Sequence, residues 1–180
     1  MKLIRNFLRQ IKYKSKFLGK KKEINFTYLN NSVVNNELTE LMNFYGSDKG
    51  GKNNHHNFAS FYSELFFHKK DYIKNFLEIG LGTNNIDILS NMGSKGQPLA
   101  SLRAWRDYFK NSNIYGADID KEILKDEERI KTYFVDQTKP ELIKKMFEKI
   151  DIKKFDIILE DGLHEFSANI CCFENSINYL

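Results

Sequence analysis

The sequence predicts an α/β fold in which helices precede a parallel β-sheet of at least four strands. Four short apolar runs, the expected strands, cover 75–79, 114–118, 132–135 and 155–159. Segments with apolar residues at helical spacing alternate with these runs, a pattern typical of strands joined by crossover helices. Because each crossover returns the chain to the same end of the sheet, the residues that follow the four strands should meet in one crevice.

Size and composition are those of a single globular domain. The chain has 180 residues, enough to bury a substantial core. Its net charge of +4 hides an asymmetry, because nine of the 28 Lys and Arg residues lie in residues 1–22, which contain no Asp or Glu. Cys171 and Cys172 are adjacent and the only cysteines, so they cannot form an ordinary structural disulfide. We therefore expect a reducing, cytoplasmic location.

Residues 1–22 form a basic extension with the pattern of an amphipathic helix. One interpretation is a weak, reversible contact with an anionic membrane surface or a polyanionic partner, and the other is a solvated extension or a helix packed on the body. Charges interrupt every apolar run, so neither a secretory signal nor a bilayer-spanning helix is expected. Nucleic acid is not an expected partner, because the body has no basic stripe with interleaved aromatic residues.

Residues 23–74 are expected to form a helical prefix that covers the site as a lid. Its first helix should begin after Asn36, a capping residue, and end at Gly46. A polar glycine loop at 45–51, YGSDKGG, separates it from a second helix. That helix should carry five apolar residues at helical spacing: Phe58, Phe61, Tyr62, Leu65 and Phe66. The candidate lid residues are Asp48, Lys49 and His56. The alternative is a turn with exposed polar side chains.

The first strand, at 75–79, leads into the glycine turn of Gly80 and Gly82, and Glu78 lies just before the turn. Such a turn binds either a dinucleotide or S-adenosylmethionine (SAM). The dinucleotide fingerprint requires a third glycine where Asn85 stands, and Glu78 would repel a pyrophosphate. SAM carries an ammonium and a sulfonium group and is compatible with that carboxylate, so SAM is favoured.

The segment 84–100 has no apolar period and contains two glycines and a proline. We expect an irregular insertion that shapes a pocket. A helix should resume at Ser101 as its N-cap, with Arg103 and Arg106 in solvent or one of them paired with a carboxylate.

Acidic residues follow the second and third strands. Asp118 ends the second strand, where an ionised carboxylate can accept hydrogen bonds from both ribose hydroxyls, and Asp120 is the alternative. Asp136 and Gln137 follow the third strand and could bond the adenine edge. The next helix is expected to start with Thr138 as its N-cap, followed by Pro140 and Glu141.

The fourth strand is followed by Asp161 and His164, which can present a hard metal ligand and a general base to one hydroxyl. A metal held by oxygen ligands would be Mg²⁺. The alternative is that His164 caps the following helix and Asp161 only bonds backbone.

Taken in order, the segments YGSDKG, LEIGLGT, SLRAWRDYF, IYGADID, VDQT and FDIILEDGLH resemble the SAM-dependent O-methyltransferases of the macrocin and mycinamicin type. The resemblance runs from about residue 41 to residue 180. It implies a Rossmann-like core at 75–180 with strands in the order 3-2-1-4, and methylation of a sugar hydroxyl. Its implied site residues are Gly80, Gly82 and Asp118 for SAM, Asp136 and Gln137 near the adenine, Asp161 for Mg²⁺, His164 as general base, and Glu78 for metal or cofactor.

The sequence departs from the family pattern at three places. Asn84 and Asn85 stand where a further glycine is common, and Leu163 stands where Ser is frequent. Only four of the seven strands of the family are present, so we expect an exposed apolar edge, marginal stability alone, and an oligomer or a complementing C-terminal fragment as partner.

Three functions follow. The first is a SAM-dependent O-methyltransferase, or its N-terminal part, acting on a small-molecule or glycan hydroxyl, such as a sugar of a surface polysaccharide or glycoconjugate. The second is a catalytically inactive truncated binding protein of the same fold. The third, an NAD-dependent oxidoreductase, is disfavoured by Asn85 and by the lack of a Tyr-x-x-x-Lys pair.

Overall fold

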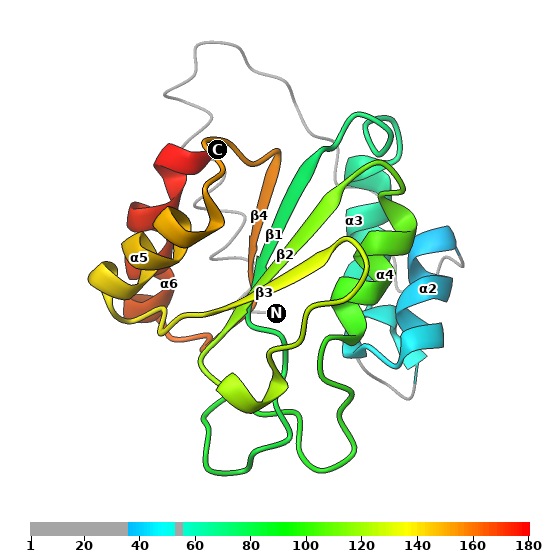
Figure 1. The fold of residues 1–180 in the computed structure, drawn as a ribbon. Coiled ribbons are helices and arrows are strands. Elements are labelled where there is room, and N and C mark those ends of the chain that lie inside the picture. The colour runs from blue at the N-terminus through cyan, green and yellow to red at the C-terminus, as the bar shows by residue number, and fades with distance from the viewer. Residues whose placement is uncertain (1–35, 53–55) are drawn as a thin grey trace. The chain divides into compact units, whose positions relative to one another are not determined.

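The computed structural model describes residues 36–52 and 56–180, so the prediction for residues 1–22 lies outside the described residues. Its centre is a four-stranded parallel sheet in the order β3-β2-β1-β4, as predicted (Figure 1). The strands are β1 (Asn75–Ile79), β2 (Asn113–Asp118), β3 (Ile130–Phe134) and β4 (Ile157–Glu160).

The bounds of β1 agree with the prediction, whereas β4 begins two residues later than expected. The reason is that the Phe155 amide donates to the carbonyl of Tyr179 at 2.7 Å instead of joining the sheet. Strands β1, β2 and β4 end at nearly the same level of the sheet, since Ile79 of β1 is paired with Ala117 of β2 and with Glu160 of β4. The loops after these strands therefore begin at the same level.

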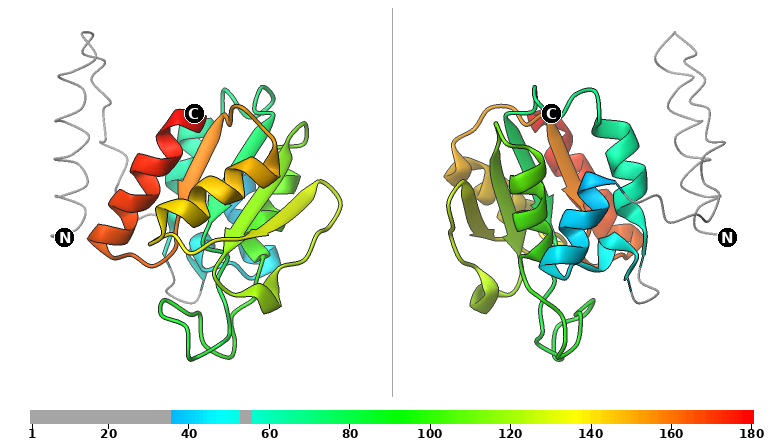
Figure 2. Two further views of the ribbon diagram at one scale, coloured as in Figure 1. Left: turned by 60° about the vertical axis from the view of Figure 1, so that its left-hand side comes forward. Right: turned by 90° about the vertical axis from the view of Figure 1, so that its right-hand side faces the viewer.

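Helices cover both faces of the sheet (Figure 1; Figure 2). One face carries α2 (Glu37–Tyr45), α3 (Phe58–Phe66) and α4 (Ala100–Tyr108). The other carries α5 (Pro140–Ile150) and α6 (Phe166–Ser176). The short 3₁₀ helices are η1 (Asp48–Gly50), η3 (Lys121–Ile123) and η4 (Ile177–Tyr179). No helix in the described ranges combines the length and apolar character that crossing a bilayer would require.

The core under α2–α4 is aromatic. Trp105 is fully buried, with its ring stacked on Phe109 and tilted against Phe76 at centroid distances of 5.6 and 4.8 Å. The α3 helix contributes Tyr62 and Phe66 to this core, but Phe58 and Leu65 are 44% and 52% exposed. The predicted helix is therefore present, yet its buried stripe is narrower than the five predicted residues.

Helix ends follow the sequence signals only in part. The Asn36 side chain accepts a hydrogen bond from the Thr39 amide at 3.0 Å, and Gly46 is left-handed, both as predicted. The prediction that Ser101 caps α4 is wrong, because Leu99 adopts the left-handed conformation and the helix begins at Ala100. Thr138 is not the cap of α5 either, since its hydroxyl donates to Asp136 and Lys139 precedes the helix.

Arg103 and Arg106 were expected in solvent or with one carboxylate partner between them, but both are only partly exposed and both pair with carboxylates. Arg103 donates to both oxygens of Glu127, and Arg106 lies 2.8 Å from Asp107. Arg103 thus ties α4 to the segment before β3, and both Arg106 and Asp107 hydrogen-bond the Tyr45 hydroxyl of α2.

The β4 edge of the sheet is incompletely covered, as expected. All four residues of β4 are only partly buried. The apolar side chains of α6 and η4 beside this edge are exposed: Phe166 (73%), Ile170 (37%), Phe173 (42%) and Ile177 (41%).

Candidate cofactor pocket

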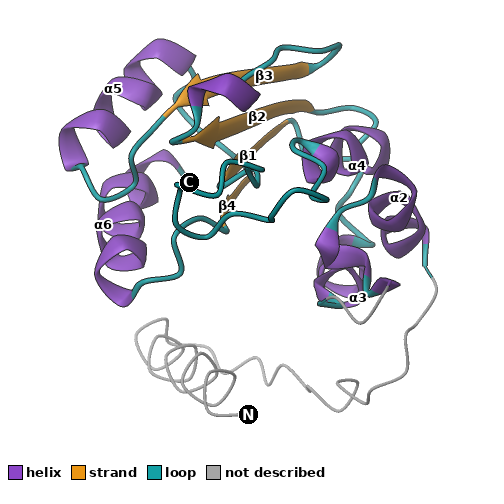
Figure 3. Cartoon of the chain, turned by 90° about the horizontal axis from the view of Figure 1, so that it is seen from below, coloured by secondary structure: helices purple, strands orange, loops and turns teal. Residues whose placement is uncertain are grey.

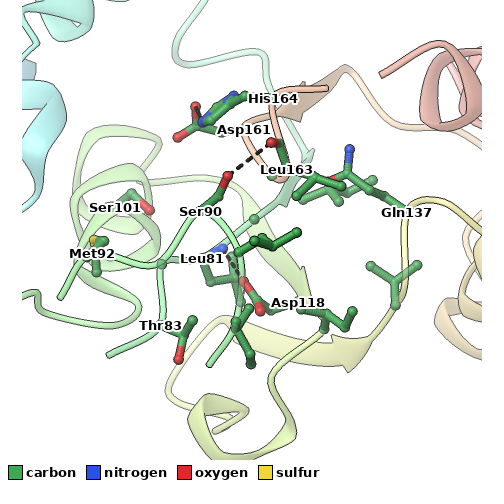
Figure 4. Close-up of a pocket in the computed structure, with 18 of the residues that line it drawn as sticks. Leu81, Thr83, Ser90, Met92, Ser101, Asp118, Gln137, Asp161, Leu163 and His164 are labelled. Atoms are coloured by element: carbon green, nitrogen blue, oxygen red, sulfur yellow. Dashed lines mark hydrogen bonds and ion pairs between the residues drawn. The ribbon is translucent and has the colours of Figure 1, made fainter. Parts of the chain in front are cut away.

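A pocket of about 400 Å³ lies at the end of the sheet where all four strands terminate. Figure 3 views the domain from this end, and Figure 4 shows the residues that line the pocket. The irregular segment that precedes α4 forms one wall, with Asp87, Ser90 and Met92, as the insertion was predicted to do. Of the predicted site residues, the structure brings together Gly80, Gly82, Asp118, Asp136, Gln137, Asp161 and His164.

The two glycines of the turn after β1 are both left-handed, with φ of 96° at Gly80 and 73° at Gly82. A Cβ at Gly80 would lie 2.3 Å from the carbonyl oxygen of Asp161, whereas at Gly82 it would meet the flexible side chain of Met92. Gly80 is thus required so that the loops after β1 and β4 can pack against each other.

Asp118 is buried in the pocket wall. Its Oδ2 accepts from the Leu81 amide at 2.6 Å (Figure 4), and its Oδ1 accepts from the Asp120 amide at 2.8 Å. Burial raises the pKa of Asp118, although these backbone hydrogen bonds oppose the shift. Asp120 lies outside the pocket lining and bonds the Thr83 hydroxyl and the Glu122 amide instead. Between the two candidates for the ribose, only Asp118 is placed to reach a ligand.

Asp136 and Gln137 line the pocket but already have protein partners. Asp136 accepts from the Thr138 amide and hydroxyl. The Gln137 amide nitrogen donates to Glu160 at 2.9 Å and its oxygen accepts from the Leu163 amide at 3.0 Å. Gln137 therefore ties the ends of β3 and β4 together, and its role at an adenine ring remains a prediction.

Glu78 lies behind the pocket and is fully buried, so it does not line the cavity. Its Oε1 is 3.3 Å from Nζ of Lys49, which also lies 2.5 Å from Oδ2 of Asp161 and 3.8 Å from Oδ1 of Asp48. Burial alone would lower the pKa of Lys49, but the surrounding carboxylates outweigh it and raise that pKa. Burial raises the pKa of Glu78, and Lys49 opposes this shift.

His164 stands at the mouth of the pocket beside Asp161 (Figure 4). Its side chain is 60% exposed, and Nε2 lies 3.9 Å from Oδ1 of Asp161. The alternative role as a helix cap is excluded, because Glu165 precedes α6 and no side chain caps that helix. The arrangement presents an accessible imidazole and a neighbouring carboxylate to a bound hydroxyl.

Sequence comparison finds similarity to three O-methyltransferases. The chain is 31% identical over 126 residues to an 8-demethyl-8-alpha-L-rhamnosyl tetracenomycin-C 2'-O-methyltransferase of Streptomyces olivaceus. It is 30% identical over 128 residues to a demethylmacrocin O-methyltransferase of Streptomyces fradiae, and 32% identical over 130 residues to a mycinamicin VI 2''-O-methyltransferase of Micromonospora griseorubida. No family model matches.

The chain is a relative of the sugar O-methyltransferases. The matches cover 70 to 71% of this chain but only 29 to 30% of each relative. Among solved structures, MycE methyltransferase from the mycinamycin biosynthetic pathway, in complex with Mg and SAH, superposes with a TM-score of 0.65 at 26% identity, over 83% of this chain and 38% of that one. A second structure of that methyltransferase also contains mycinamycin VI. The predicted methyltransferase fold is confirmed.

A magnesium site is incomplete in this O-methyltransferase relative. Among residues 36–52 and 56–180, no three acidic, histidine or cysteine side chains lie close enough to share a metal ion. Asp161 faces the pocket, but its Oδ2 is held by Lys49. The described residues therefore do not fit Mg²⁺ as they stand.

Several residues that line the pocket are not indicated by the sequence pattern. Ser101, a predicted helix cap, lines the pocket, and the Ser90 hydroxyl donates to the Leu163 carbonyl at 3.0 Å across it. Of the lid candidates, Asp48 and Lys49 line the pocket, whereas His56 does not and instead stacks on Phe58 at 4.9 Å. The YGSDKG segment indicates that Lys49 could lie near the site. No sequence pattern indicates that Lys49 forms an ion pair with Glu78.

Proposed function

We propose that this chain binds SAM in the pocket and is an O-methyltransferase, or the N-terminal part of one, that acts on a sugar hydroxyl. The observation that carries this proposal is the convergence of the glycine turn, Asp118 and His164 on one cavity. The similar proteins are O-methyltransferases and the similar structure contains SAH, and both facts support the same activity. Since the chain spans less than a third of the curated relatives' length, activity, substrate and partners remain proposals for the whole protein.

The residues of the pocket suit SAM. Asp118 offers a carboxylate for ribose hydroxyls, and Leu81, Ile119 and Val135 offer apolar surface for the adenine. The acidic residues around Lys49 complement a ligand that bears an ammonium and a sulfonium group. When bound, SAM supplies an electrophilic methyl group.

His164 is the proposed general base. With Nε2 closest to Asp161, Nδ1 is left to take the proton of an acceptor hydroxyl, and the Asp161 carboxylate stabilises the resulting imidazolium. Holding the hydroxyl in line with the methyl group supplies much of the remaining rate. The acceptor we propose is a sugar of a surface polysaccharide or glycoconjugate, and the two free cysteines, Cys171 and Cys172, support a cytoplasmic location.

A second candidate is a non-catalytic SAM-binding protein. It is favoured by the Lys49 ammonium on Asp161 and by the open β4 edge, where a complementing C-terminal segment would add further strands.

Methyl transfer from radiolabelled SAM to sugar-containing acceptors tests these proposals. We expect His164→Ala to lose about 10²- to 10⁴-fold in rate while SAM affinity is retained. His56→Ala is the matched control, because His56 is exposed and does not line the pocket. Equal rates for wild type and His164→Ala would remove the base assignment. SAM binding with no transfer, by this chain and by a version extended to seven strands, would favour the second candidate.

A further inference from the structure

Two acidic side chains at the end of β2 hold the turn that follows β1. Asp118 accepts from the Leu81 amide at 2.6 Å, inside the glycine turn. Two residues further along both segments, Asp120 accepts from the Thr83 hydroxyl. Asp118 and Thr83 line the pocket but Asp120 does not, so Asp120 acts on the pocket only through the side chain that it holds.

Thr83 connects three segments around the pocket that it lines (Figure 4). Its hydroxyl donates to Asp120 and accepts from the Asn85 amide at 3.0 Å. Its carbonyl accepts from the Met92 amide at 2.8 Å, in the irregular segment that forms one wall. Thr83 and Asp120 are only 3% and 6% exposed, so their contact is shielded from competing water. One residue thus fixes both the turn and the wall relative to β2.

The turn needs this contact because no helix follows it directly. In a dinucleotide-binding βαβ unit the glycine turn leads into a helix, whose backbone hydrogen bonds hold it. Here α4 begins only at Ala100, and the described stretch between Ile79 and Ala100 contains neither helix nor strand. A turn with two glycines and no helix behind it has many accessible conformations, and the cost of ordering it on binding would weaken a ligand's affinity.

We propose that Asp120 is a positioning residue of the SAM pocket, which holds the Thr83 hydroxyl and so keeps the glycine turn in its binding conformation before the ligand enters. The contact is a charge-assisted hydrogen bond, which is stronger than one between neutral groups. This inference rests on the proposed function and extends it to a residue outside the pocket lining.

Calorimetric titration with SAM tests the inference in wild type, Thr83→Val, Thr83→Ser, Asp120→Ala and the double variant Thr83→Val with Asp120→Ala. Thr83→Val keeps the shape of the side chain but removes its hydroxyl, and we expect it to bind SAM about tenfold more weakly through loss of a hydrogen bond to a charged group. Thr83→Ser keeps the hydroxyl and should bind within about twofold of wild type. The double variant should bind no more weakly than Asp120→Ala alone, because both changes remove the same contact. Full affinity in Thr83→Val, or losses that add in the double variant, would overturn the inference.

Hydrogen exchange without SAM, followed by mass spectrometry, separates positioning of the turn from a general loss of stability. Amides in residues 83–97 should exchange severalfold faster in Thr83→Val than in wild type, and Thr83→Ser should restore the slow rate. The α5 helix, at residues 140–150, is the internal control and should not change. Equal acceleration in both segments would mean a merely structural role. If wild type binds no SAM, the proposed function fails and takes this inference with it, whereas SAM binding that Thr83→Val leaves intact removes this inference alone.

Discussion

Two clusters of charged side chains connect the helices to the rest of the domain, and they differ in the burial of their cations, 7% exposed for Lys49 against 28% and 19% for Arg103 and Arg106, and in charge balance. The inner cluster is Lys49 with Asp48, Glu78 and Asp161, and the outer cluster is Arg103 and Arg106 with Asp107 and Glu127. In the outer cluster the side chains are 19 to 32% exposed and two cations match two anions. In the inner cluster one ammonium serves three carboxylates beside the pocket.

This difference supports a structural role for the outer cluster and a role in the proposed ligand binding for the inner one. The outer cluster has the fork-shaped geometry of an Arg–carboxylate pair, and Tyr45 of α2 donates to Asp107 at 2.5 Å, so the cluster orients α2 and α4. An inner cluster built only for stability would balance its charges or be apolar. Its excess of carboxylates is better explained by a cationic ligand at the adjoining pocket.

The largest expected effect is on stability when the inner cation is removed. Lys49→Met should lower the free energy of unfolding by about 3 to 5 kcal/mol, because it leaves the fully buried Glu78 carboxylate without its partner. Arg103→Met, the matched change in the outer cluster, should cost about 1 kcal/mol or less, since a partly exposed pair contributes little. Urea unfolding in the presence of EDTA measures both. Similar losses in the two variants would mean that the clusters do not differ as described.

A smaller effect distinguishes the clusters by pH. Burial raises the pKa of Glu78, so the folded chain holds that proton more tightly than the unfolded chain and loses stability as pH rises above the ordinary value of 4.5. Hydrogen bonds from Arg103 lower the pKa of Glu127, so its contribution is present above 4.5 and is lost as pH falls below it.

The measurement is the free energy of unfolding against pH for Glu78→Gln and Glu127→Gln. Relative to wild type, Glu78→Gln should gain stability as pH rises from about 4 to 7, and the deficit of Glu127→Gln should shrink as pH falls toward about 3. Parallel curves for the two variants would contradict the opposite shifts.

The sequence predicted the sheet well because its signals are local. The run at 75–79 is apolar and bounded by Gly80, so the bounds of β1 were correct. The meeting of Asp118, Asp136 and Asp161 followed from parallel topology alone, since every crossover returns the chain to one end of the sheet.

Features that depend on packing between distant segments were not predictable. Ser101 and Thr138 are good capping residues, yet the left-handed Leu99 and the bond from Thr138 to Asp136 set the helix starts. The pairing of Lys49 with Glu78 joins positions far apart in the chain, and no local pattern encodes it.

Calorimetric titration with SAM and with NAD tests most directly the claim that the pocket at the strand ends is a SAM site. The account predicts that the chain binds SAM and not NAD, and that Asp118→Asn weakens SAM binding by about tenfold or more through loss of a charged acceptor for the ribose. Asp126→Asn, at a surface carboxylate paired with Lys131, should leave the affinity unchanged. Binding of NAD without SAM, or full SAM affinity in Asp118→Asn, would contradict it.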